Sequence, residues 1–144
     1  MTEIAFHFNA PDKWSYVCRL LRKAAGSGAR VAVVAPDDAL QLLDRALWSL
    51  APHAFVPHCM AQEDGLMLES SPIVLAREVE GLVHHDVLVN LLGGIPEGFE
   101  RFARLVEIVS QDDARDRQEA RQRWRHYADR GYSIISHDVV QKGA

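Results

Sequence analysis

The sequence predicts an α/β fold with a mostly parallel central sheet and helices on both of its faces. Short runs rich in β-branched residues alternate along the chain with segments whose apolar residues recur at helical spacing. Such alternation implies βαβ units, in which the strands run parallel. The run at 30–35 is apolar after its first residue, as is typical of a strand covered on both faces. The length of 144 residues suits a single domain over 1–144.

The first half of the chain is predicted to hold two strands and two helices. Strands are marked by alternating or continuous apolar residues, and helices by capping residues and helical periodicity. The elements are expected at 4–8 (strand), from about Lys13 to the glycines within 26–28 (helix), at 30–35 (strand), and from Asp37 or Asp38 through Trp48, with Pro52 marking its end (helix).

The second half begins with an extended segment at 55–58 and a long loop at 61–72, which we expect to be mobile. The remaining elements are expected at 73–76 (strand), 87–92 (strand), 93–98 (turn), from Phe99 to about Ile108 (helix), from a cap at Asp112 or Asp113 to Arg130 (helix), and at 132–136 (strand).

Composition restricts the function classes. The formal net charge of −4 opposes direct binding of duplex DNA, since phosphate contacts require a positive surface. No apolar run approaches the length of a membrane span, and the first residues lack a signal-peptide pattern, so we expect a soluble cytoplasmic protein with no membrane contact. The two cysteines, Cys18 and Cys59, are expected to be reduced thiols.

A basic, aromatic helix near the C-terminal end is the most informative segment. Helical spacing places Arg117, Arg121, Trp124 and Arg125 on one face. A solvated face shaped partly by the helix dipole is the plain alternative. Arginine beside aromatic rings instead favours a site for a carboxylate, above all an acidic peptide tail that ends in a hydrophobic residue. Single-stranded nucleic acid stacking on Trp124 is a further alternative that the net charge opposes.

A pair of aromatic residues forms a second candidate site. Trp48 lies at the predicted end of a helix, and Phe55 lies between two prolines, the second of which is Pro57. Core packing is the ordinary fate of large aromatic residues. Aromatic residues in such surface segments would instead anchor a protein partner.

Motifs for catalysis, nucleotides or metals are missing from the sequence. The histidines at 84–85 and 53–58 lack the usual ligand spacings, and the glycines at 93–98 are not followed by a phosphate-loop lysine. We therefore expect no metal, no cofactor and no catalytic residues. The alternative is a small Rossmann-like enzyme with a cryptic nucleotide or metal site.

Together these segments resemble the chi subunit family of bacterial DNA polymerase III over nearly the whole chain. The resemblance rests on the strand ending near Phe8, Leu47-Trp48 followed by the segment 55–58, the run 89–91 before a proline and a phenylalanine, the pattern Arg121-x-Arg123-Trp124-Arg125-x-Tyr127 with Gly131-Tyr132, and His137-Asp138. It implies a mononucleotide-binding-like fold without a nucleotide site, and a noncatalytic role.

The resemblance also implies two interfaces. One binds the psi subunit, which links chi to the clamp loader, and carries over to Trp48, Phe55 and Pro57. The other binds the acidic C-terminal tail of single-stranded DNA-binding protein, so that contact with nucleic acid is indirect. The tail-binding role carries over to Arg117, Arg121, Trp124, Arg125 and Tyr132. Arg117 and Arg125 stand where other members have lysine, which keeps the charge and changes the geometry.

Overall fold

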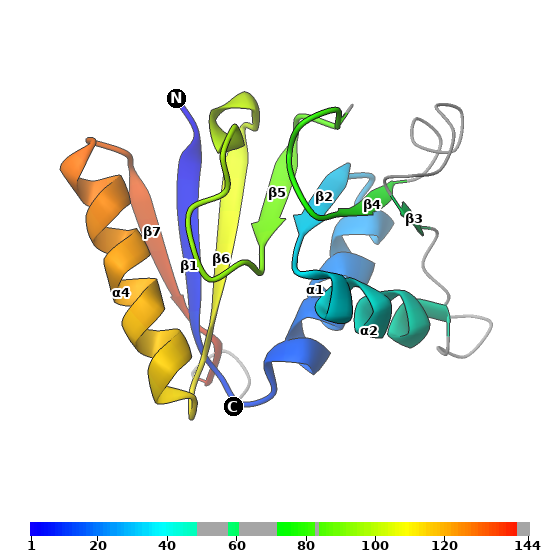
Figure 1. Ribbon diagram of the computed structural model, residues 1–144, viewed down its shortest axis with the longest axis horizontal. Coiled ribbons are helices and arrows are strands. Elements are labelled where there is room, and N and C mark those ends of the chain that lie inside the picture. The colour runs from blue at the N-terminus through cyan, green and yellow to red at the C-terminus, as the bar shows by residue number, and fades with distance from the viewer. Residues whose placement is uncertain (49–57, 61–71, 83, 141–144) are drawn as a thin grey trace.

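The computed structural model describes residues 1–48, 58–60, 72–82 and 84–140. Within them the chain forms one sheet of seven strands, in the order β3-β4-β2-β5-β6-β1-β7, and every strand pair is parallel (Figure 1). The strands are β1 (Glu3–Ala10), β2 (Val31–Val34), β3 (His58–Met60), β4 (Ile73–Ala76), β5 (Val87–Asn90), β6 (Arg104–Ser110) and β7 (Ile134–Asp138). The expected α/β class and parallel sheet are confirmed.

Helices pack on both faces of this sheet, as expected. They are α1 (Lys13–Gly26), α2 (Asp37–Trp48) and α4 (Ala114–Asp129), with a 3-10 turn at Phe99–Arg101. Val31 and Val33 of β2 pack in the core under α1 and α2, whereas the intervening Ala32 packs in the core under α4. Successive residues of a strand point to opposite faces, so α1 and α2 lie on one side and α4 on the other.

Local sequence signals place the helix ends where they were expected. The Asp12 side chain caps α1 by accepting a hydrogen bond from the Ser15 backbone N–H at 3.2 Å. Beyond the end of α1, Gly28 adopts a φ of +84°, which side chains with a Cβ rarely tolerate. α2 begins at Asp37, and its last residue is Trp48. The segments 55–57 and 61–71, for which an extended chain and a mobile loop were predicted, lie outside the described residues.

The predicted helix from Phe99 to about Ile108 is wrong. Only Phe99–Arg101 is helical, as a single 3-10 turn, and Phe102 is already extended, with φ of −99° and ψ of 149°. The segment continues as the central strand β6, five of whose seven residues are buried. A strand covered on both faces is apolar almost throughout and shows no period of two, so it resembles a short buried helix in sequence.

Among the described helices, none combines the length and apolar character that crossing a membrane would require.

Candidate functional site

The start of α4 is fixed by two aspartates. The Asp113 side chain accepts a hydrogen bond from the Asp116 backbone N–H at 3.1 Å, which makes Asp113 the N-cap that was one of two predicted. The Asp116 carboxylate in turn accepts from the backbone N–H of Ser110 at 2.8 Å and from Lys13 Nζ at 3.0 Å. The first turn of α4 is thereby tied to the end of β6 and to α1.

The end of α4 is closed by a glycine. The Gly131 backbone N–H donates to the carbonyl of Ala128 at 3.1 Å, and the Tyr132 N–H donates to the carbonyl of Tyr127 at 3.1 Å. Gly131 has a φ of +79°, so the two bonds form a Schellman motif. The chain then enters β7 at Ile134, two residues later than predicted.

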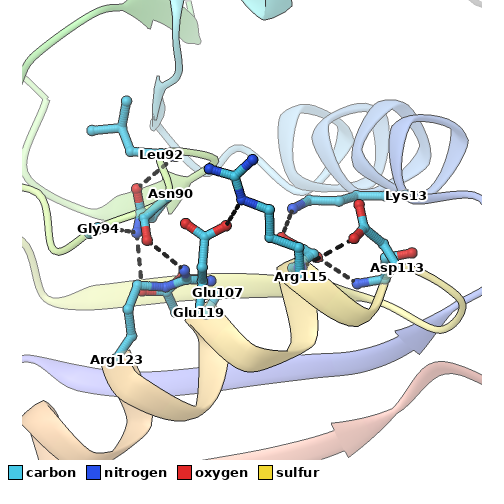
Figure 2. Close-up of polar contacts among 12 residues, drawn as sticks. Lys13, Asn90, Leu92, Gly94, Glu107, Asp113, Arg115, Glu119 and Arg123 are labelled. Atoms are coloured by element: carbon cyan, nitrogen blue, oxygen red, sulfur yellow. Dashed lines mark hydrogen bonds and ion pairs between the residues drawn. The ribbon is translucent and has the colours of Figure 1, made fainter.

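The inward face of α4 carries a polar network that is closed to solvent, which we call the Glu107 network (Figure 2). Glu107 of β6 has no exposed surface. Its carboxylate accepts from Arg123 Nε at 3.0 Å, from the Tyr127 hydroxyl at 2.6 Å and from Asn90 Nδ2 at 3.0 Å. Arg123 Nη1 also donates to the carbonyl oxygen of Gly93 at 3.0 Å. The network joins α4 to β5, β6 and the loop after β5.

Burial raises the pKa of the Glu107 carboxyl, while the Arg123 guanidinium and the hydrogen bonds from Tyr127 and Asn90 act to lower it. Burial together with the carboxylate of Glu107 raises the pKa of the Tyr127 hydroxyl, which therefore remains a hydrogen-bond donor. Glu107 and Arg123 neutralise each other, and Tyr127 and Asn90 each donate to the same carboxylate, as buried polar groups require.

Beside the network, but open to solvent, a groove of about 480 Å³ runs between α4 and the sheet, and we call it the α4 groove. Its apolar wall comes from strands far apart in the sequence, with Phe6 and Phe8 on β1 and Val109 on β6. Ala120 of α4 adds a small side chain that leaves room between helix and sheet. The described part of its lining contains no aspartate or glutamate.

Four of the five residues predicted to bind a peptide tail line this groove: Arg117, Arg121, Trp124 and Arg125. The Trp124 ring lies against Phe6, with centroids 4.9 Å apart, and 38% of its surface is exposed. Arg117 Nη1 donates to the Gln111 carbonyl oxygen at 3.2 Å. No described acidic side chain forms an ion pair with Arg121 or Arg125.

Of the other predicted site residues, Tyr132 is the one whose side chain is described. Tyr132 does not line the groove, because its ring packs 5.3 Å from Phe99 and 6.2 Å from Tyr127, on the inward side of α4. Trp48 is the last residue of α2, and its side chain is not described. Phe55 and Pro57 lie outside the described residues.

Two features of the site were not predicted from the sequence: the apolar wall of the groove and the buried arginine beneath α4. Phe6 and Phe8 were assigned only to a strand, and Arg123 was counted among the basic residues of the helix. A signal for Arg123 was present, because it lies three residues after Ala120 and four before Tyr127, on the stripe that faces the sheet. An arginine at such a position requires a buried acid, and Glu107 supplies it.

Metal ligands do not gather in the described part of the chain, where no three His, Cys, Asp or Glu side chains are close enough to hold an ion.

Comparisons with known proteins agree with the resemblance. A family model described as "DNA polymerase III chi subunit, HolC" matches residues 1–135. The chain is 36% identical over 121 residues to the DNA polymerase III subunit chi of Pseudomonas aeruginosa, covering 83% of this chain and 82% of the relative. It is 29% identical to the subunit of the same name from Haemophilus influenzae (85% and 84% covered) and 28% identical to that of Escherichia coli (82% and 80%). The chain therefore belongs to the family of the DNA polymerase III chi subunit, an accessory subunit rather than a catalytic one.

Proposed function

We propose that this chain is a single-domain, noncatalytic adaptor in the cytoplasm, which connects the DNA polymerase III clamp loader to single-stranded DNA-binding protein during replication. In this proposal the α4 groove binds the acidic C-terminal tail of the single-stranded DNA-binding protein. A second surface that includes Trp48, Phe55 and Pro57 binds the psi subunit, which tethers the chain to the clamp loader.

The chemistry of the α4 groove carries the tail-binding part. Its rim has three guanidinium groups and no described acid lines it, so a peptide with several carboxylates is attracted at the rim. The apolar wall of Phe6, Phe8 and Val109 suits a hydrophobic side chain at the end of that peptide. Arg121 and Arg125 would pair with carboxylates, and Trp124 would flank the terminal side chain. Tyr132 supports the groove from beneath α4 rather than by contact.

Affinity for a labelled acidic peptide with a free hydrophobic C-terminus tests this assignment. Arg121→Ala and Arg125→Ala should each weaken binding about tenfold, because each removes a charge-assisted hydrogen bond. Arg115→Ala is the matched control, since Arg115 is an exposed arginine of the same helix outside the groove, paired with Glu119 at 3.6 Å. Binding should weaken with salt and when the peptide terminus is amidated. Unchanged affinity in both groove variants would contradict the assignment.

The psi interface needs a separate measurement. Trp48→Ala and Phe55→Ala should abolish co-purification with the psi subunit, because truncating aromatic anchors removes most of the energy of such an interface. Binding of the tail peptide to the same variants is the control, and it should equal that of the unmodified protein. If a variant still co-purifies with psi, the substituted residue is not part of the interface.

A further inference from the structure

A second cavity lies on the opposite side of β1 from the α4 groove. Strand alternation separates the two, because Phe6 and Phe8 line the α4 groove whereas His7 points to the α1 side. β7 behaves in the same way: Ser136 lines the α4 groove and His137 lines the second cavity. We call this space, of about 360 Å³, the α1/β7 cavity.

The cavity exists because no described helix fully covers this corner of the sheet. α1 packs chiefly over β6 and β2, whereas α4 packs over β6 on the other face (Figure 1). On β7, Ile135 therefore remains 47% exposed. The open corner is bounded by one side of α1 and by the α1-facing residues of β1 and β7.

Polar side chains from three elements converge on this space. α1 contributes Tyr16, Arg19 and Lys23, β1 contributes His7, and β7 contributes His137. The rings of His7 and His137 lie 4.9 Å apart, and His7 Nδ1 forms a hydrogen bond with the Tyr16 hydroxyl. Leu20 and Val139 complete the lining with apolar surface.

The charge of the cavity is positive in a chain that is negative as a whole. Arg19 and Lys23 are exposed at its rim, and neither forms an ion pair with a described acid. Among the described residues, no aspartate or glutamate lines the space. Asp138, the nearest acid in sequence on β7, alternates to the other face, where its carboxylate accepts from the Val140 backbone N–H at 3.1 Å. Burial raises the pKa of Tyr16, which keeps that hydroxyl protonated.

We propose that the α1/β7 cavity binds a phosphoryl group, as free phosphate or as the phosphate of a small organic monoester. Donors that converge from three directions match the tetrahedral oxygens of a phosphoryl group better than the planar oxygens of a carboxylate. Arg19 and Lys23 supply permanent charge, and the imidazole and phenol groups line the inner wall. The volume and the apolar surface of Leu20 and Val139 leave space for a small organic substituent.

NMR titration of the full chain with inorganic phosphate and with glycerol 3-phosphate, at constant ionic strength, tests this proposal. Both probes should shift the ring signals of His7 and His137 in a saturable way, and acetate should bind more weakly. Tighter binding of the ester would assign the site to an organic monoester, and equal binding to free phosphate. Acetate binding as tightly as phosphate would overturn the proposal.

Variants separate this cavity from nonspecific charge effects and from the α4 groove. Arg19→Ala and Lys23→Ala should each weaken phosphate binding about tenfold. Arg22→Ala is the matched control, since Arg22 is an exposed arginine of the same helix outside the cavity. In Arg121→Ala, phosphate should still shift the ring signals of His7 and His137, even though this variant binds the tail more weakly. Equal affinity in the Arg19 and Arg22 variants would refute the site.

Discussion

The two sides of α4 use the same residue type in opposite ways. On the inward side, Arg123 is buried and its guanidinium meets the carboxylate of Glu107 at 3.0 Å. On the solvent-exposed side, Arg121 and Arg125 border an apolar groove for which the described residues supply no acid. An arginine whose charge is neutralised within the fold orients the helix, whereas arginines left without an acid are available to a partner. If the proposed function holds, the direction in which each arginine points decides whether it stabilises the fold or binds the tail.

The largest expected effect that tests this contrast is on stability. Arg123→Met should lower the free energy of unfolding by about 3–5 kcal/mol, because it leaves the Glu107 carboxylate buried without its cation. Arg121→Met should change the same quantity by less than about 0.5 kcal/mol. Urea unfolding followed by circular dichroism measures both. Equal losses in the two variants would mean that the two sides of α4 are not energetically distinct.

A smaller effect concerns the Tyr127 hydroxyl. Tyr127→Phe removes one donor to the Glu107 carboxylate and should cost about 1–3 kcal/mol of unfolding free energy, since hydrogen bonds to charged groups are among the stronger ones. Tyr132→Phe is the matched control, because Tyr132 joins the same aromatic cluster through its ring. Thermal unfolding measures the stability of both variants. If Tyr127→Phe is as stable as Tyr132→Phe, the Tyr127 hydroxyl contributes nothing to the stability of the fold.

The smallest effect is at the start of the helix. Asp113→Ala should destabilise the protein by about 1 kcal/mol through loss of the N-cap, whereas Asp112→Ala, one residue earlier and exposed, should have almost no effect. Chemical denaturation of the pair provides the measurement. Tail binding by the Asp113 variant, measured well below its unfolding temperature, should be unchanged, because the arginines of the groove lie further along α4.

The features that were predicted correctly from the sequence are determined by residues close to one another along the chain. The start of α1 at Lys13, the cap at Asp113 and the shared face of Arg117, Arg121, Trp124 and Arg125 each follow from neighbours within a few turns. The features that were not predicted are determined by contacts between residues far apart in the sequence. β6 resembles a helix in sequence because a strand covered on both faces is apolar almost throughout, and its one acid, Glu107, meets Arg123 only in the fold. The tail-binding role of Tyr132 rested on the family resemblance, and in the structure its ring packs by Phe99 and Tyr127.

The position of β1 between β6 and β7 has a consequence for how the protein is made. Ile4, at the start of the chain, pairs with Leu105 on one side and with Ile134 on the other. On the ribosome, the first strand to emerge must wait for β6 (Arg104–Ser110) before it has one neighbour and for β7 (Ile134–Asp138) before it has both, and such non-local pairing is slow to form. The α4 groove is lined by Phe6 and Phe8 of β1 together with residues of α4 and Ser136 of β7, so it is complete only after α4 and β7 have been made.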